Sequence, residues 1–260
     1  MQRVNHIIVM MQENHSFDNY FGALPYAPGS PFHAGPCAAG DNQCVDALTC
    51  TSSGGSLTCS NSNPEADGSA AVVAFHDPRL CVSPDLDHSW VGTHQEINAT
   101  DPNNSLNGTN NGFVSVNDQT EQIDKGETPI DDDTMGFYTQ TDLPFYYSMA
   151  QTFTLDDRYF SSAPAQTVPN RMYLYAATSF GHLVTTTGEA IPPGSGYQPI
   201  NGTILDQLDN QSVSWGEYVD TGGLSELGIP YGALFRFPPT PPHFQTVDDF
   251  KSQAASGNLP

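Results

Sequence analysis

The sequence predicts an α/β fold with long loop-rich insertions. Three observations lead to this prediction: a continuous apolar run near the start, amphipathic segments in the second half, and a long intervening stretch rich in turn-forming residues. Strand and helix patterns that alternate along a chain are typical of α/β proteins. With 260 residues, of which 37% are hydrophobic, the chain is long enough for one large domain with insertions.

The first predicted element is a buried parallel strand at residues 4–11. Its apolar residues include Val and Ile and run almost without interruption until a polar group follows, as in strands covered on both faces. Ser16 then offers an N-cap, and Asp18 falls in the first turn that would follow. These signals predict a helix beginning at "SFDNYFG".

The middle of the chain, from about residue 23 to 135, is rich in Pro, Gly, Asn, Ser and Asp. A structureless stretch of this length is rare in a compact domain, so we expect inserted loops that cover a site, with helical pieces around 85–98. Residues 143–152 and 169–178 are expected to be helices, the second with Pro169 at its first position. The segment 203–212 has apolar residues at amphipathic spacing and predicts a further helix, whereas 153–160 and 213–219 read as strands.

Four of the five cysteines lie within the middle stretch, at positions 37, 44, 50 and 59. None of their spacings is C-x2-C, which argues against a zinc site. A Cys-rich surface insertion at about 30–82, held by at least one disulfide, is the better interpretation and implies an oxidising compartment. Cys81 is a further candidate partner for one of the four, which would leave one thiol unpaired.

The charge balance restricts the partners. Seven Lys and Arg stand against 29 Asp and Glu, for a net charge of −22, so neither nucleic acid nor an anionic membrane is an expected partner. Some of the carboxylates are candidates for holding cations. No apolar run reaches the length of a spanning helix, and 4–11 lacks the features of a signal peptide, so no stable membrane insertion is expected. Together with the cysteines, this predicts an extracellular or periplasmic protein.

Glu13 and Asn14 directly follow the first predicted strand. In an open α/β sheet the ligand site lies beyond the carboxyl ends of the strands. A carboxylate beside an amide oxygen suits a hard divalent cation such as Mg²⁺, Ca²⁺ or Mn²⁺. The alternative is that the residues after the strand merely form a turn.

Thr167 stands just before the predicted helix at 169–178, where unpaired N–H groups and the helix dipole favour an anion. A hydroxyl at this position that also touches a cation can attack phosphorus, although an ordinary helix cap is the alternative. His88 and His94 lie near Asp85 and Asp87 in "DLDHSWVGTH". An imidazole there can steady a phosphoryl group or protonate a leaving oxygen, whereas surface histidines are the alternative.

Four stretches carry a resemblance to a known family: "IVMMQENHSFDNYFG", "LDHSW", "MGFYTQTDLPFYYSMAQTFTLDDRYFSSAPAQTVPNRMYLYAAT" and "TILDQLDNQSVSWGEY". In this order they resemble the motifs of the phosphoesterase family that contains bacterial phospholipases C and respiratory-burst-inhibiting acid phosphatases. The resemblance implies an alkaline-phosphatase-like fold, in which helices flank a central sheet. It implies that Glu13 and Asn14 bind a divalent metal, that Thr167 is both nucleophile and metal ligand, that His88 contacts the phosphoryl group, and that Asn170 binds substrate.

The sequence departs from the family pattern in two places. His15 stands where the family usually has Arg. The family completes its metal site with an Asp pair and a His in a later block, and Asp248 and Asp249 do not stand in that context. The resemblance therefore implies that residues 1–260 are the N-terminal part of a single phosphoesterase domain, truncated at its C-terminus.

The function predicted from these features is hydrolysis of phosphate mono- or diesters, of the phospholipase C or acid phosphatase type, with a divalent metal and a Thr nucleophile. The expected partner is a phosphate-ester substrate, with a phospholipid headgroup as one candidate. The alternative is a non-catalytic, disulfide-stapled extracellular binding or coat module, which the cysteines and acidic loops favour.

Overall fold

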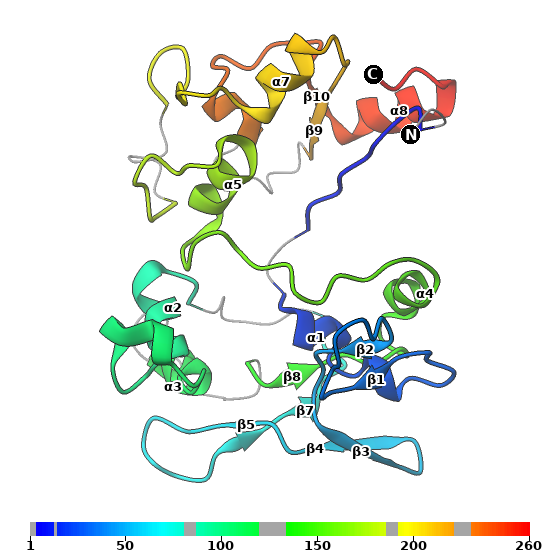
Figure 1. Ribbon diagram of the computed structural model, residues 1–260, viewed down its shortest axis with the longest axis vertical. Helices are drawn as coiled ribbons and strands as arrows, with labels where there is room; N and C mark the ends of the chain where they lie inside the picture. The colour runs from blue at the N-terminus through cyan, green and yellow to red at the C-terminus, as the bar shows by residue number, and fades with distance from the viewer. Residues whose placement is uncertain (1–3, 13–14, 81–86, 120–133, 186–191, 221–229) are drawn as a thin grey trace. The chain divides into compact units, whose positions relative to one another are not determined.

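The computed structural model describes residues 4–12, 15–80, 87–119, 134–185, 192–220 and 230–260 (Figure 1). These residues form a mixed α/β protein with two compact units. The first unit contains Met1–Met11 and Ser161–Pro260, and the second contains Gln12–Phe160. The helices that the structure describes are too short or too polar to cross a membrane.

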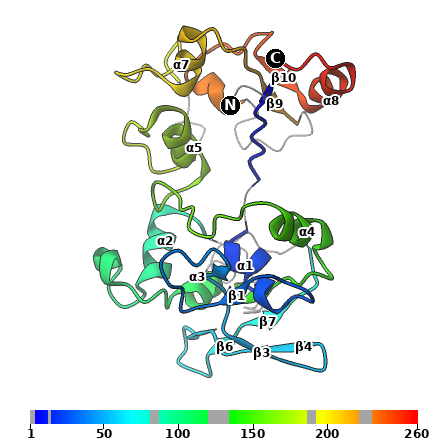
Figure 2. The same ribbon diagram turned by 45° about the vertical axis from the view of Figure 1, so that its right-hand side comes forward.

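The second unit holds most of the strands. Its elements are α1 (Phe17–Phe21), η1 (Leu24–Tyr26), β1 (His33–Ala34), β2 (Cys44–Val45), β3 (Cys50–Ser53), β4 (Ser56–Cys59), β5 (Ser62–Asn63), β6 (Val72–Val73), β7 (Phe75–His76), α2 (Trp90–Ile97), η2 (Pro102–Asn107), α3 (Phe113–Gln119), β8 (Gly136–Phe137) and α4 (Pro144–Thr152). Helices α2 and α3 pack against each other and lie side by side in both views (Figures 1 and 2).

The first unit is built from helices and one strand pair. Its elements are α5 (Thr167–Ala176), α7 (Ile204–Asn210), β9 (Glu217–Val219), η4 (Tyr231–Leu234), β10 (Phe244–Thr246) and α8 (Val247–Ser256). Asp249 has a structural role here, because its carboxylate accepts the backbone N–H of Thr246 (2.9 Å) in a capping box at the start of α8.

The described strands form five two-stranded sheets. The pairs β1–β2, β7–β8 and β9–β10 are parallel, whereas β3–β4 and β5–β6 are antiparallel. The mixed α/β class agrees with the prediction, but the described residues contain no single central sheet. The strands are two to four residues long, which is too short to build one.

The predicted strand at 4–11 is wrong for this structure. Residues 4–12 have no regular secondary structure and are exposed; the side chains of Ile7 and Val9 are 80% and 76% exposed. A continuous apolar run is a strand pattern only when neighbouring elements cover it on both faces. No described strand pairs with this segment, so its apolar residues remain in solvent.

The predicted strand at 153–160 is also wrong. Asp156 accepts the backbone N–H of Arg158 (3.1 Å) in a local turn, and the Asp157 carboxylate accepts the N–H of Asp46 (2.6 Å). Aspartates that bond to nearby backbone groups favour turns over strands. The predicted strand at 213–219 is confirmed only in its last three residues, as β9.

The helix predictions are largely confirmed. Ser16 caps α1 by accepting the N–H of Asn19 (3.1 Å), and α4 and α7 fall within the predicted 143–152 and 203–212. The helical piece expected around 85–98 is α2.

The expected disulfide staple is confirmed, with two bonds, Cys37–Cys44 and Cys50–Cys59. All four cysteines of the middle stretch therefore pair with each other, and Cys81 lies outside the described residues. The Cys-rich segment does not lie entirely on the surface. Cys59 is buried in a cluster with Ala23, Leu48, Ala74 and Phe137, so it contributes to the core of the second unit.

Candidate active site

Helix α5 begins at Thr167, two residues before the predicted start at Pro169. Pro169 is therefore the third helical residue. Its missing N–H costs nothing there, because the first N–H groups of a helix have no partner within the helix. Thr167 is the first residue of α5 instead of its cap. Gln166 occupies the cap position, and its side chain makes no capping hydrogen bond.

Asn170 holds the loop that leads into α5. Its side-chain Nδ2 donates to the carbonyl oxygens of Ala163 (3.0 Å) and Ala165 (2.8 Å), and its Oδ1 accepts the N–H of Ala163 (3.0 Å). The neighbouring segment adds two bonds, from Val168 N–H to Thr185 Oγ1 (3.2 Å) and from Thr185 N–H to Gln166 Oε1 (2.6 Å). The backbone around Thr167 is thus fixed from both sides. Asn170 as a substrate-binding residue remains a prediction.

The buried face of α5 anchors the helix in the first unit. Val168 and Met172, both almost fully buried, pack with Leu234 and Phe235. On the same unit, the carboxylate of Glu217 accepts the N–H of Gly232 (2.9 Å), and burial raises the pKa of Glu217. Thr167 itself is half-buried, and its hydroxyl has no hydrogen bond to any described residue. A hydroxyl on a fixed backbone, without a partner among the described residues, is available to a ligand.

His88 precedes α2 in the second unit. Ser89 caps this helix by accepting the N–H of Gly92 (3.0 Å), and Asp87 accepts the N–H of Ser89 (2.7 Å). A Cβ on Gly92 would lie 2.3 Å from the Asp87 carboxyl carbon, so only glycine lets Asp87 pack on the first turn of α2. The contacts of Asp87 and Ser89 therefore hold the backbone at His88 in place.

Glu96 joins this group, although no sequence motif marks it. Burial, and then the charge of Asp87, raise the pKa of Glu96 to about 7, while the charge of His88 acts in the opposite direction. A glutamate with this pKa can gain or lose a proton near neutral pH. The burial that raises this pKa comes from the folded structure and is not visible in the spacing of residues along the sequence. His94 is engaged within α2, where its Nδ1 lies 2.7 Å from the carbonyl oxygen of Trp90.

Glu13 and Asn14, the predicted metal ligands, lie outside the described residues. Their neighbours on both sides belong to an aromatic part of the second unit. Gln12 accepts the hydroxyl of Tyr146 (2.8 Å), and His15 Nδ1 lies 2.6 Å from Asn19 Oδ1. The convergence of Glu13, Asn14 and Thr167 on one cation therefore remains a prediction.

The structure brings Thr167 and Asn170 together in the first unit and places His88 in the second. One other group of potential metal ligands occurs in the described ranges: His33, Asp41 and Cys44. Cys44 is bonded to Cys37 in a disulfide, so its sulfur is not a thiolate in this structure.

Comparison with known proteins gives a family match. The model of the Phosphoesterase family matches residues 4–260. Phospholipase C B of Mycobacterium tuberculosis is 29% identical over 266 residues, covering 96% of this chain and 43% of that protein. Non-hemolytic phospholipase C of Burkholderia pseudomallei is 29% identical over 239 residues, covering 86% of this chain and 27% of that protein. Non-specific phospholipase C4 of Arabidopsis thaliana is 24% identical over 245 residues, covering 94% of this chain and 38% of that protein. This chain spans less than half the length of each of these relatives.

Proposed function

Because this chain belongs to the Phosphoesterase family, we propose that it is the N-terminal part of a hydrolase that cleaves phosphate esters with Thr167 as its nucleophile. The observation that carries the proposal is the start of α5. The Thr167 hydroxyl is half-buried, without a partner among the described residues, on a backbone that Asn170 and Thr185 hold in place. The anion-favouring end of the helix lies at the same residue.

The donor set fits the hard divalent cation that the resemblance implies. A carboxylate at Glu13, an amide oxygen at Asn14 and the hydroxyl oxygen of Thr167 are all hard ligands. When bound, the cation lowers the pKa of a coordinated hydroxyl and neutralises phosphoryl oxygens.

The reaction proceeds in two displacements. The Thr167 oxygen attacks phosphorus while its proton passes to solvent water, and the bond from phosphorus to the leaving oxygen breaks. His88, assigned through its match to the family motif, protonates that oxygen or contacts the phosphoryl group. Water then hydrolyses the phosphothreonine, which restores the Thr167 hydroxyl.

The substrate class follows from the relatives, which are named as phospholipases C. We assign a phospholipid headgroup ester as the substrate, with a soluble phosphate ester as the other outcome of the test. An extracellular or periplasmic location is supported by the two disulfides.

Hydrolysis by the full-length protein tests this function. We expect release of p-nitrophenol from p-nitrophenylphosphorylcholine, dependent on added Mg²⁺, Ca²⁺ or Mn²⁺ and abolished by a chelator. Preference for p-nitrophenyl phosphate would instead indicate an acid phosphatase type. No turnover of either compound with any of the three metals would contradict the enzyme assignment and favour the non-catalytic, disulfide-stapled binding module.

A further inference from the structure

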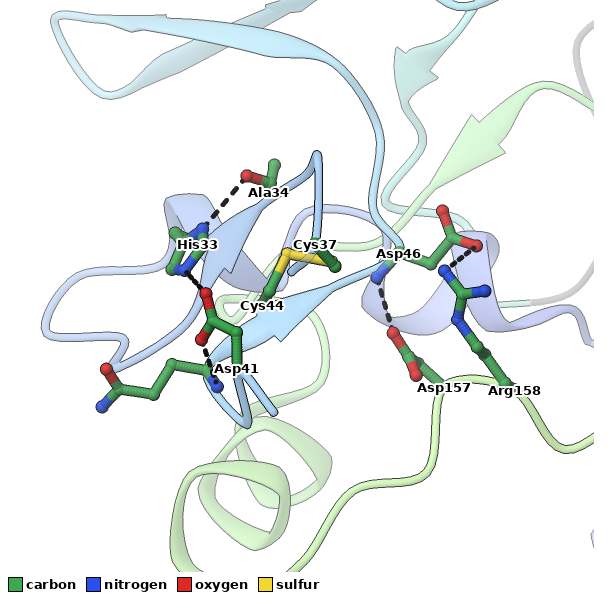
Figure 3. Close-up of a disulfide and its surroundings, with 9 residues drawn as sticks. His33, Ala34, Cys37, Asp41, Cys44, Asp46, Asp157 and Arg158 are labelled. Atoms are coloured by element: carbon green, nitrogen blue, oxygen red, sulfur yellow. Dashed lines mark hydrogen bonds and ion pairs between the residues drawn. A yellow bond between two sulfur atoms is a disulfide. The ribbon is translucent and has the colours of Figure 1, made fainter. Parts of the chain in front are cut away.

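The disulfide loop Cys37–Cys44 is surrounded by side chains that are ligands in zinc proteins (Figure 3). The parallel pairing of β1 with β2 sets His33 directly opposite Cys44. Asp41, from the loop between the two cysteines, lies with its Oδ2 3.1 Å from His33 Nε2. The potential ligand atoms of His33, Asp41 and Cys44 all lie within 4.8 Å of one another.

The oxidised loop is not a complete metal site. A disulfide sulfur carries no negative charge, and the thiolate is the form of cysteine that binds metals. His33 and Asp41 are then the only two usable ligands of the group, and they bond to each other.

We propose that reduction of Cys37–Cys44 converts this loop into a four-ligand zinc site formed by His33, Cys37, Asp41 and Cys44. Two electrons from a dithiol reductant break the sulfur–sulfur bond; the reductant becomes a disulfide and its two protons pass to the cysteine sulfurs. Zn²⁺ then displaces these two protons. The proposed site would bind a different type of ion from the hard-cation site proposed at Thr167, because thiolate and imidazole ligands select a softer ion.

The distances suit this ion. Zinc–sulfur bonds of about 2.3 Å and zinc–nitrogen or zinc–oxygen bonds of about 2.0 Å place tetrahedral ligands roughly 3 to 4 Å apart. The His33–Asp41 pair is already at this separation. The two sulfurs need only separate by about 2 Å from their bonded distance, which rotation about the cysteine side chains provides.

The loop does not depend on the disulfide alone for its shape. His33 N–H donates to the Gln43 carbonyl (2.9 Å), and Asp41 Oδ1 accepts the N–H of Gln43 (3.1 Å). The backbone N–H of Asp41 donates to the carbonyl of Ala38 (3.1 Å). None of these bonds uses a cysteine side chain, so we expect them to persist after reduction and to keep the ligands close together.

The exposure of the proposed ligands also suits an ion that enters from solvent and is then partly shielded from it. The side chains of His33 and Asp41 are 53% and 33% exposed, which gives the ion a path from solvent. Cys44 is buried, so one thiolate is shielded once the ion is bound. The C-x6-C spacing alone does not reveal the site, because its other two ligands come from strand register and loop conformation.

The second disulfide provides a matched control. Cys50 and Cys59 face each other across the antiparallel pair β3–β4. In the part of the chain that the structure describes, neither belongs to a cluster of potential ligands. Reduction of this pair therefore adds two thiols without a prepared site.

The test is titration of the full chain with Zn²⁺, and with Co²⁺ as a spectroscopic probe. The chain carries Cys81→Ser so that this thiol cannot contribute. One sample stays oxidised, and the other is reduced with a phosphine, which becomes a phosphine oxide by taking oxygen from water. We expect one more equivalent of Zn²⁺ bound after reduction than before, with a thiolate–cobalt charge-transfer band only in the reduced sample. Equal binding in both samples, or none in either, would overturn the proposal.

Variants identify the ligands. His33→Gln and Asp41→Asn keep polar groups at exposed positions and leave the fold intact, yet each should weaken zinc binding by more than the ten- to hundredfold loss typical of a removed outer-shell partner. Cys50→Ser/Cys59→Ser should retain one equivalent, whereas Cys37→Ser/Cys44→Ser should lose it. If the two double variants behave in the opposite way, or His33→Gln and Asp41→Asn bind zinc as tightly as the parent, the assignment is wrong.

Discussion

Two helix starts, those of α2 and α5, satisfy their backbone groups differently. At α2, the Ser89 hydroxyl accepts one N–H of the first turn, and Asp87 accepts the N–H of Ser89. At α5, the cap residue Gln166 makes no capping bond, and Thr167 has no hydroxyl partner in the described part of the chain. A side-chain cap contributes to stability at α2. At α5 the Val168 N–H is taken by Thr185 Oγ1 and Pro169 has no N–H, so the distinctive feature there is the Thr167 hydroxyl without a partner among the described residues. We therefore expect the Ser89 hydroxyl to stabilise α2, and the Thr167 hydroxyl of α5 to contribute to the proposed reaction more than to stability.

Removing the Thr167 hydroxyl gives the largest expected effect. In the full-length protein, Thr167→Ala should lower kcat by about 10³-fold or more, because it deletes the attacking oxygen. Thermal unfolding should hardly change, since no hydrogen bond among the described residues is lost. Thr167→Ser keeps a hydroxyl and should retain much of the rate. If the alanine variant turns over normally, α5 does not carry the nucleophile and the contrast between the two helix starts disappears.

The second prediction concerns pH and the α2 region. The folded-state pKa of Glu96 is about 7, above its ordinary value of 4.5. Between these two pH values the folded protein therefore holds a proton on Glu96 that the unfolded chain has released. Stability should therefore fall as pH rises from about 4.5 to 7 and then level off. Glu96→Gln removes this loss and should raise the free energy of unfolding by about 3 kcal/mol at pH 8.

Denaturant unfolding at two pH values measures this effect. At pH 5 the folded protein already carries a neutral Glu96, so variant and parent should differ much less than at pH 8. A difference that is the same at both pH values would show that the carboxylate of Glu96 is not held protonated by its surroundings.

Asn170 gives a third test, because its side chain holds the loop that precedes α5. Asn170→Ala removes bonds to the backbone at Ala163 and Ala165, each worth roughly 0.5–1.5 kcal/mol, so we expect a loss of about 2 kcal/mol in stability. In the full-length protein kcat should fall, since the loop no longer fixes Thr167, and an accompanying rise in KM would support the predicted substrate-binding role of Asn170. Asn258→Ala, which loses one exposed bond to Ser256, is the matched control and should leave both stability and kcat unchanged. An unchanged Asn170→Ala would show that the loop is held by other contacts.

The smallest expected effect is at the cap of α2. Ser89→Ala removes the acceptor for the Gly92 N–H and should cost about 1 kcal/mol. Calorimetry of this variant beside Thr167→Ala compares the two helix starts directly. Equal losses in the two variants would mean that α5 is capped in the same sense as α2.

Local signals in the sequence predicted most helices, because caps and periodicity are read from neighbouring residues. Ser16 and the apolar pattern of 203–212 are examples. The strand at 4–11 was predicted from an apolar run alone, and such a run becomes a strand only with partners that its own residues do not specify. The start of α5 was placed two residues late because a Pro at the third helical position gives the same sequence signal as one at the first.

The candidate site was only partly predictable for the same reason. The family motifs predict roles for Thr167 and His88, and these roles remain predictions; the family model shows membership of the family over residues 4–260. Glu96 and the His33–Cys44 pairing depend on burial and strand register, which no local motif encodes. Asn170 lies in a motif, but the bonds it makes to the preceding loop appear only in the folded chain.

The exposed run at 4–11 has a consequence for the behaviour of the chain in concentrated solution. An unpaired apolar segment is a template for strand pairing between molecules. The net charge of −22 opposes such contacts by mutual repulsion. The range of this repulsion shrinks from about 10 Å in 0.1 M salt to about 3 Å in 1 M salt. Charge repulsion between molecules therefore opposes self-association through the exposed apolar segment at 4–11. Because salt screens this repulsion, we expect added salt to lower the solubility of the polypeptide.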